Sequence, residues 1–251
     1  MATPQALLEE LVTANHILAS EGVVDAFGHI SVRSPDNSER YFLSRARSPE
    51  LVELDDIMEF TLAGEPIDAR GRKPYLERFI HGAIYQARPD VQSVVHNHSR
   101  SVVPFAVTGA PLRPIVHSCA TIGFHIPVWD AQDKFGDTTL LVSDMEMGRD
   151  LATVLGRNRS ALMRGHGCTV VGNSIKEAVY TAVYLEVNAN LQLQASRLGP
   201  ITFLTAGEVE KISSRLRDAK PGEGYDRAWE YWRSRAYRTK NNANETSQGS
   251  V

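Results

Sequence analysis

Hydrophobic and polar positions follow two different periods along this chain, which predict helices and strands in succession. Between residues 3 and 22 the apolar positions recur every three or four residues behind Thr3 and Pro4, as in an amphipathic helix. The stretch 23–71 changes to short alternating runs separated by polar turns, which predicts strands. The remaining predicted strands cover 91–99 and, as a strand–turn–strand unit, 161–172. The remaining predicted helices cover 74–87, about 145–156, 174–197, 206–217 and 221–238.

This mixture of elements predicts one α/β domain. No internal repeat is present and no linker divides the body, so we assign residues 1–238 to that domain. Residues 239–251 are polar and lack large apolar side chains. We therefore expect this end of the chain to be a disordered tail.

Composition narrows the classes of function. Of the 251 residues, 42% are hydrophobic and 23% are charged, which is ordinary for a folded globular protein. The formal net charge of −3 argues against a nucleic-acid partner. No apolar run reaches the roughly 18 residues needed to span a bilayer, and the N-terminal segment is acidic, so we expect no membrane segment and no signal peptide. Two cysteines, Cys119 and Cys168, cannot form a disulfide framework, which favours the cytoplasm.

Two histidines at neighbouring same-face positions are the first candidates for metal chemistry. In the predicted strand, His96 and His98 point to the same face as Val94, because side chains alternate between the faces of a strand. Two imidazoles in that arrangement can bind one cation. The pair also fits hydrogen-bonding histidines at a strand end, so the motif alone leaves both interpretations open.

A third histidine, His166, lies between Gly165 and Gly167. Glycine on both sides permits a tight turn and a close approach of backbone. Alone, His166 is typical of a turn residue. With the first pair it supplies the third nitrogen of a three-histidine site, which leaves one coordination position for water or substrate and so indicates a catalytic metal. Such a site does not need Cys168, which we expect to be a small buried strand residue.

Glu77 is the candidate acid–base group. It lies at the edge of the apolar stripe of the helix predicted at 74–87, one turn before His81. A carboxylate near a metal can be a ligand, a proton carrier or both in turn. Its position alone favours a solvated helix acid, so its assignment depends on the histidines.

The candidate residues lie in short segments whose order along the chain resembles the class II aldolase/adducin family over about residues 5–200. The likeness is carried by residues 27–33, 77–81, 84–85, 88–99 and 164–167. It implies a three-layer α/β/α sandwich with a central mixed or antiparallel sheet, and a homotetramer with active sites between subunits. It also implies one divalent transition metal per subunit on His96, His98 and His166, with Glu77 as acid–base group or fourth ligand. Mn²⁺ or Zn²⁺ is the expected ion, and Fe²⁺ and Co²⁺ also suit these ligands.

Within the family, the stretch from Arg72 to Tyr85 resembles a branch of decarboxylases acting on dihydroxyphthalate-like and hydroxypyridine-dicarboxylate substrates. Two departures from the sugar-phosphate aldolases agree with that branch. Their phosphate-binding loop is replaced by Ala26-Phe27-Gly28-His29, and the tyrosine proton donor that follows a histidine is replaced by Ser118. The resemblance therefore implies a metal-dependent decarboxylase of an ortho-hydroxylated aromatic or heteroaromatic acid.

This resemblance also implies roles for further residues. Glu77 brings the proton that replaces carbon dioxide, and His117 is the second expected catalytic residue. A second carboxylate on the substrate needs a cationic clamp, for which three cations are available, at least one of them expected to be a plain surface charge. The expected substrate-binding residues are His29, Ser31, Ser44, Arg45, Lys73 and Arg78.

Two other functions remain open. The same metal site would serve an aldolase-type lyase acting on a non-phosphorylated hydroxy-keto acid. A non-catalytic, adducin-like interaction domain is the alternative of another class, although such a domain has no need of three histidines and Glu77. A metal assay separates the last alternative from the other two.

Two features of the C-terminal half carry separate hypotheses. Glu186 falls on the apolar stripe of the helix at 174–197, where it either orients a metal-binding histidine, pairs with an arginine across a subunit contact, or forms an internal salt bridge. Tyr225, Trp229 and Trp232 share one helix face. That face predicts core or subunit packing or, by analogy with the family, a segment that closes over a neighbouring active site.

Overall fold

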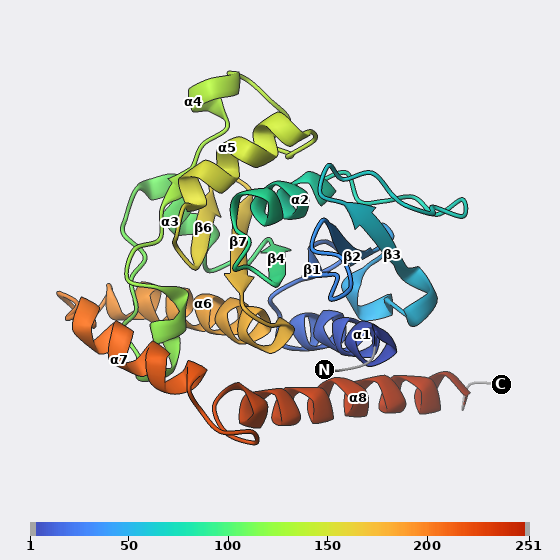
Figure 1. Cartoon of the computed structure of the whole chain (residues 1–251). Coiled ribbons are helices and arrows are strands. Elements are labelled where there is room, and N and C mark those ends of the chain that lie inside the picture. The colour runs from blue at the N-terminus through green and yellow to red at the C-terminus, as the bar shows by residue number, and fades with distance from the viewer. Residues whose placement is uncertain (1–3, 249–251) are drawn as a thin grey trace.

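The computed structural model describes residues 4–248 of the chain, with side chains from 5 to 238, and shows one sheet between two layers of helices (Figure 1). The sheet has seven strands in the order β3-β2-β1-β4-β7-β6-β5, and all neighbours are antiparallel except β5 and β6. The strands are β1 (His29–Arg33), β2 (Arg40–Ser44), β3 (Ile57–Thr61), β4 (Ser93–Asn97), β5 (Val128–Trp129), β6 (Ser160–Met163) and β7 (Gly167–Gly172).

Helices cover both faces of this sheet. In Figure 1, α2 and α5 lie above it, whereas α1, α6 and α8 lie below it. The α-helices are α1 (Pro4–Ser20), α2 (Arg78–Ala87), α3 (Val103–Thr108), α4 (Gln132–Phe135), α5 (Met145–Leu155), α6 (Ile175–Ala195), α7 (Ala206–Arg217) and α8 (Tyr225–Gln248). The 3₁₀ helices are η1 (Pro49–Leu51), η2 (Leu54–Asp56) and η3 (His117–Ile122).

Each face of the sheet has its own hydrophobic core. On the α2 side, Ile84 and Leu151 pack against strand residues such as Val94. On the other side, Leu11 and Val179 pack with a second set from the same strands. Burying one such aliphatic side chain stabilises the fold by roughly 1.5–3 kcal/mol. The predicted three-layer α/β/α sandwich with a mixed sheet is therefore confirmed.

The start of α2 differs from the prediction in a way that matters for the site. The sequence predicts a helix from residue 74, but Pro74 forms an isolated β-bridge with Arg45, and the helix begins at Arg78. Glu77 is consequently the N-cap residue of α2. Glu77 therefore does not lie on a face of α2. The helix starts late because the bridge between Pro74 and Arg45 keeps the preceding segment extended beside the end of β2.

The C-terminal helix also differs from the prediction. A disordered tail is predicted over residues 239–251, yet α8 continues to Gln248, and 249–251 lie outside the described residues. The chain from Tyr225 to Gln248 contains no glycine or proline, and an established helix gains one hydrogen bond for each residue added. None of the helices in the described part of the chain combines the length and apolarity needed to cross a membrane.

The aromatic face of α8 packs inside this chain. Trp229 and Trp232 are 8% and 5% exposed and belong to the core shared with α1 and α6. The packing interpretation is confirmed. The alternative, an aromatic wall over a neighbouring active site, is wrong for these two side chains because their rings are already buried.

Candidate metal centre and active site

The central strands and two turns bring the three candidate histidines to one end of the sheet. His96 lies on β4, His98 follows that strand directly, and His166 lies in the turn between β6 and β7. Gly165 adopts a left-handed φ of 66°. A Cβ on Gly167 would lie 2.1 Å from the backbone oxygen of Asn97, so only glycine lets β7 approach β4 this closely.

The imidazole rings converge with their Nε2 atoms facing one another. The distance from His96 Nε2 to His98 Nε2 is 3.2 Å, and that from His98 Nε2 to His166 Nε2 is 3.0 Å. Glu77 Oε2 lies 3.5 Å from Nε2 of both His96 and His166. One ligand atom from each of the four residues lies within 4.8 Å of the others. The convergence expected from sequence is present in the fold.

These four residues fit a divalent transition metal. His96 Nδ1 lies 3.1 Å from the carbonyl oxygen of Cys168 and donates to it, which leaves a lone pair on Nε2. His98 and His166 can present the lone pairs of their own Nε2 atoms to the same point, so one cation placed there can bind all three imidazoles. Nitrogen ligands about 2.05 Å from a tetrahedral ion stand about 3.3 Å apart, close to the separations observed here. A buried carboxylate beside them adds the negative charge that such an ion requires.

Burial and neighbouring charge set the protonation of Glu77. Its side chain is buried, which raises its pKa, but the imidazoles of His96 and His166 have the larger combined effect and hold the pKa well below its ordinary range. Glu77 Oε1 accepts a hydrogen bond of 3.0 Å from the backbone N–H of Val142. Burial, and next the neighbouring His96, lower the pKa of His98 to about 4. Glu77 is therefore a carboxylate and His98 a neutral imidazole, the forms in which these two residues can bind a metal.

Cys168 is not part of the cluster. Its thiol is fully buried and donates to Asn97 Oδ1 at 3.1 Å, and burial raises the pKa of this thiol far above its ordinary value. The expectation of a small buried strand residue is confirmed. Asn97 Oδ1 also accepts from the backbone N–H of Ser99 at 3.1 Å, so this side chain fixes the turn that carries His98.

A second polar group, buried beside the cluster, includes two of the predicted substrate-binding residues. His29 is the cross-strand partner of His96, with ring centroids 5.1 Å apart, and its Nδ1 lies 2.6 Å from His81 Nε2. Ser31 is fully buried and bonds to His81 Nδ1 at 2.6 Å and to the Tyr85 hydroxyl at 2.8 Å. Ser31 is therefore bonded to protein groups in this chain, and its direct contact with a substrate stays a prediction.

Sequence reasoning missed His81 and Tyr85 as parts of this group. The signal was present, because His81 and Tyr85 are four residues apart and therefore lie on one face of α2. Both are buried, and burial lowers the pKa of His81 to about 3. His81 is therefore a neutral imidazole.

Two of the three predicted cations are already engaged by the protein. Arg45 Nε donates to Asp56 at 2.5 Å. Arg78 donates to the carbonyl oxygens of Gly64 and Tyr75, at 2.6 and 3.1 Å. Lys73 is exposed and forms no ion pair with any described residue. Of the three candidates for a carboxylate clamp, Lys73 is the one whose charge is available.

The remaining predicted residues lie apart from the cluster contacts. Ser44 is buried, with its hydroxyl next to that of Tyr75. His117 is exposed at the start of η3, and no contact between it and the four clustered residues is present in the described chain. Glu186 accepts hydrogen bonds from Ser101 N and Oγ, at 3.1 and 2.5 Å. Within the described chain Glu186 makes no hydrogen bond or ion pair with His96, His98 or His166, which contradicts the hypothesis that it orients a metal-binding histidine.

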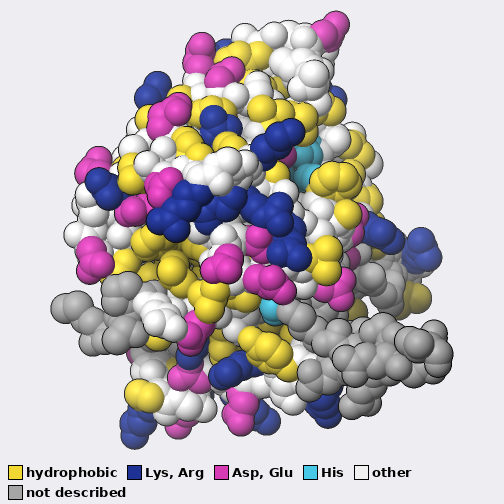
Figure 2. Space-filling model, turned by 90° about the vertical axis from the view of Figure 1, so that its right-hand side faces the viewer, with side chains coloured by type: hydrophobic (Ala, Val, Ile, Leu, Met, Phe, Trp, Pro, Cys, Tyr) yellow, Lys and Arg dark blue, Asp and Glu magenta, His cyan; other side chains and the backbone are white. Residues whose placement is uncertain are grey.

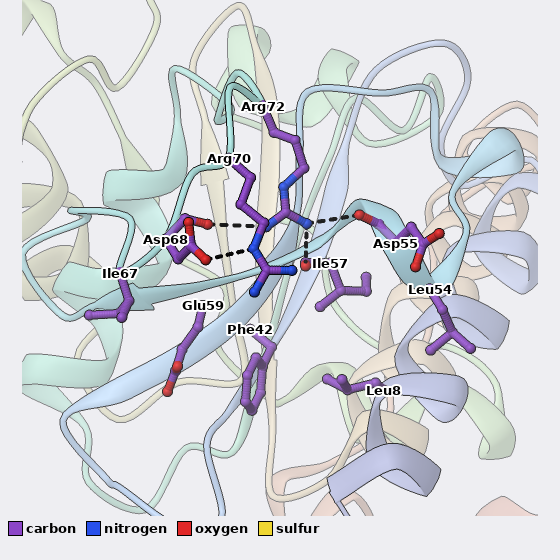
Figure 3. A pocket seen from close by; sticks show the side chains of 10 residues that line it. All are labelled: Leu8, Phe42, Leu54, Asp55, Ile57, Glu59, Ile67, Asp68, Arg70 and Arg72. Atoms are coloured by element: carbon purple, nitrogen blue, oxygen red, sulfur yellow. Dashed lines mark hydrogen bonds and ion pairs between the residues drawn. The ribbon is translucent and has the colours of Figure 1, made fainter.

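Basic side chains form a band across one face of the molecule, with acidic side chains along it (Figure 2). Near the β3 edge, a hollow of about 570 Å³ is lined by Arg70 and Arg72 among others (Figure 3). Arg70 pairs with Asp68 at 2.6 Å, and Arg72 donates to the backbone oxygens of Asp55 and Ile57 at 2.8 and 2.9 Å. None of the clustered histidines lines this hollow. Its arginines stabilise the loop after β3.

Known proteins with similar sequences and folds agree with this arrangement. Residues 9–193 match the family model for the Class II Aldolase and Adducin N-terminal domain. The chain is 39% identical over 245 residues to Decarboxylase tropJ of Talaromyces stipitatus, covering 88% of this chain and 90% of that protein. It is 29% identical over 233 residues to a 3,4-dihydroxyphthalate decarboxylase of Terrabacter sp., covering 87% and 92%. An L-fuculose 1-phosphate aldolase structure from Glaciozyma antarctica matches with a TM-score of 0.74 and 26% identity, covering 96% and 94%.

These proteins are decarboxylases and an aldolase, so the comparisons support an enzyme of the lyase class. The resemblance drawn from five short segments is confirmed, including its direction toward the hydroxyaromatic decarboxylases. The matched residues 9–193 contain every member of the histidine and glutamate cluster. This chain belongs to the class II aldolase and adducin N-terminal domain family.

Proposed function

We propose that this chain is a metal-dependent, non-oxidative decarboxylase of an ortho-hydroxylated aromatic or heteroaromatic carboxylic acid. The observation that carries the proposal is the convergence of three imidazole Nε2 atoms with the buried carboxylate of Glu77. Similarity to two decarboxylases over most of the chain's length supports loss of carbon dioxide as the reaction. Mn²⁺ or Zn²⁺ is the expected ion, held by His96, His98 and His166.

The bound metal and Glu77 would have different roles in the reaction. A bound divalent ion supplies a Lewis acid for the phenolic and carboxylate oxygens of the substrate. Glu77 is anchored by one oxygen on the Val142 N–H, which leaves Oε2 facing the histidines. As carbon dioxide leaves, the electron pair of the broken carbon–carbon bond stays with the ring. A proton taken up from water and carried on Glu77 Oε2 then forms the new carbon–hydrogen bond, which returns Glu77 to its carboxylate form.

Phe27 supports a planar substrate. Its ring is 66% exposed, and its centroid lies 6.3 Å from that of His98. An exposed aromatic ring at the cluster offers an apolar wall to an aromatic acid. A hydroxyl-rich sugar phosphate gains little from such a wall, so this position favours the decarboxylase over the aldolase.

An aldolase-type lyase acting on a hydroxy-keto acid is the second candidate, because the fold matches an L-fuculose 1-phosphate aldolase at 26% identity. For either reaction we propose a small-molecule substrate and a homotetramer with active sites between subunits. In that assembly the exposed His117 is the residue we expect to reach a neighbouring site.

A substrate panel with metal restoration tests the proposal. Purified protein is stripped with a chelator, each of Mn²⁺, Zn²⁺, Fe²⁺ and Co²⁺ is restored, and carbon dioxide release is measured. The panel contains 3,4-dihydroxyphthalate, hydroxypyridine dicarboxylates and hydroxy-keto acids. We expect metal-dependent release from an ortho-hydroxylated aromatic acid. Aldehyde from a keto acid without carbon dioxide would establish the aldolase, and failure to bind any metal would establish the interaction domain.

A further inference from the structure

A continuous row of hydrogen-bonded side chains runs from the edge of the histidine cluster into the core. Its members, in order, are His29, His81, Ser31 and Tyr85, joined by contacts of 2.6, 2.6 and 2.8 Å. None of the four is more than 3% exposed. All lie on the α2 side of the sheet, and Arg33 stacks on the Tyr85 ring at 4.7 Å, which fixes the inner end.

The chemistry of the members gives this row a direction. A neutral imidazole has one donor nitrogen and one acceptor nitrogen, so His81 must donate at one end and accept at the other. A phenol is a stronger hydrogen-bond donor than an aliphatic hydroxyl. Besides Ser31, the other acceptor near the Tyr85 hydroxyl within the described chain is the carbonyl oxygen of Gln92 at 3.5 Å, which is the outer limit of a hydrogen bond. Tyr85 therefore donates to Ser31.

The remaining bonds follow from that first one. The Ser31 hydroxyl has accepted from Tyr85, so it donates its own proton to His81 Nδ1. His81 then carries its proton on Nε2 and donates to Nδ1 of His29. With Nδ1 acting as acceptor, the proton of His29 lies on Nε2, and no hydrogen bond within the described chain uses that nitrogen.

We propose that Tyr85, Ser31 and His81 are positioning residues that fix His29 as its Nε2–H tautomer, so that it donates a hydrogen bond to an oxygen atom of the substrate. His29 is the cross-strand partner of His96, which places its ring beside the metal centre. The oxygen concerned is a carboxylate or ring oxide of the aromatic acid, so this inference rests on the proposed function. Ser31 acts through His81 and touches no substrate.

The tautomer can be measured without turnover. Long-range ¹H–¹⁵N correlation spectra of the zinc-loaded, full-length protein distinguish a protonated from an unprotonated imidazole nitrogen. We expect His29 Nδ1 to be unprotonated and Nε2 to be protonated. A proton on His29 Nδ1 would overturn the proposal, and because the wild-type protein gives this result, no variant has to fold.

Two tyrosines on the α2 side of the sheet provide a matched pair of variants. Tyr41 is also fully buried, and its hydroxyl donates to the backbone oxygen of Arg78 at 3.0 Å, outside the row. With 3,4-dihydroxyphthalate as substrate, we expect Tyr85→Phe and Ser31→Ala to lower kcat about tenfold with a smaller change in KM. Both should shift the His29 ring resonances, whereas Tyr41→Phe should leave kcat and those resonances unchanged.

Equal kcat values for Tyr85→Phe and Tyr41→Phe would overturn the positioning role. The two proposals also fail separately. If His29 shows the expected tautomer but no acid in the panel loses carbon dioxide, the proposed function is wrong and the fixed donor stands. If carbon dioxide is released while His29 is protonated on Nδ1, the fixed donor is wrong and the proposed function stands.

Discussion

The histidine cluster and the arginine-rich segment 45–78 both collect residues that sequence reasoning assigned to the site, but the fold uses them in opposite ways. In the cluster, three Nε2 atoms point at one another, at 3.0 to 3.2 Å between neighbours. In the arginine-rich segment, Arg45 and Arg47 both bind Asp56, with Nη1 of Arg47 at 2.6 Å. Arg72 is likewise held by backbone carbonyls (Figure 3).

This contrast separates a ligand-binding site from a structural network of ion pairs and hydrogen bonds. Cations that meet carboxylates and carbonyls already have their favourable partners, and bringing a substrate to them means breaking existing bonds. Three converging imidazole nitrogens and a carboxylate can instead all bind one cation placed between them. The cluster can therefore bind a cation, whereas the arginine-rich segment stabilises its own loops. Substitutions in the two regions should consequently fail in different ways.

The largest effect is expected for His166→Ala. Losing one of three imidazoles removes the metal, and with it at least about a thousandfold of the rate of carbon dioxide release. Metal content per chain, measured on the same preparation, should fall well below one. His125→Ala is the matched control, because His125 is exposed and lies outside the cluster. Full metal content in His166→Ala would contradict the assignment of this residue as a ligand.

The next largest effect concerns stability in acid, and it separates the two regions by pH. The pKa of His81 is about 3 in the folded chain, mainly because of burial, against an ordinary value of 6.5. Between those values the unfolded chain binds the additional proton, so stability falls as the pH falls from 6.5 to 3. The loss from this residue is roughly 5 kcal/mol.

Asp56 affects the stability of the fold in a lower pH range than His81 does. Burial raises its pKa, but hydrogen bonds from the Glu53 backbone and from Arg45 and Arg47 outweigh burial and lower it below 3.8. Its stabilising contribution is present above 3.8 and is lost below that value. Denaturant unfolding of metal-free protein from pH 7 to 3 measures both windows. His81→Gln should flatten the slope between 6.5 and 4 and leave the decline below 3.8, and an unchanged slope above 4 would contradict the assignment.

A smaller effect on rate, with the metal retained, is expected for Glu77→Gln. The amide keeps the size of the side chain and loses the proton carrier, so kcat should fall by about a hundredfold or more. His96, His98 and His166 remain to hold the ion. Retained metal with lowered kcat identifies an acid–base group, whereas loss of metal together with activity identifies a resting ligand. Metal content and carbon dioxide release on the same sample distinguish the two.

How far sequence predicted this molecule depends on the kind of interaction. The alternation of HISVR and the spacing of His96 and His98 gave strands and a shared face, because both follow from the period of two in a strand. The glycines around His166 predicted a tight turn, which Gly165 and Gly167 form. These are local consequences of backbone geometry.

The contacts that sequence did not predict involve partners from other elements. Arg45 is a candidate for the carboxylate clamp by sequence, and in the fold its Nε donates to Asp56 at 2.5 Å. Ser31 is a candidate for substrate contact by sequence, and in the fold His81 and Tyr85 of α2 bond to its hydroxyl. A period describes which face a side chain lies on, but it contains no information about which residue from another element will reach it first.

The smallest effects are expected within the arginine-rich segment, where Arg78 and Lys73 make a direct comparison. Arg78 donates to the carbonyl oxygens of Gly64 and Tyr75 and stacks on Phe79 at 4.2 Å, so Arg78→Met should lower the free energy of unfolding by about 1–3 kcal/mol. Exposed Lys73 makes no such contacts, and Lys73→Met should change stability by less than about 0.5 kcal/mol.

Catalysis should show the reverse order if Lys73 binds the second carboxylate of a substrate. Lys73→Met should raise KM about three- to tenfold for 3,4-dihydroxyphthalate and leave KM unchanged for a dihydroxybenzoate with a single carboxylate, because only the first substrate presents a charge to the missing ammonium. Equal changes for the two acids would mean that Lys73 is a surface charge. The clamp would then have to come from outside the arginine-rich segment, since Arg45 and Arg78 are already bound to their own chain.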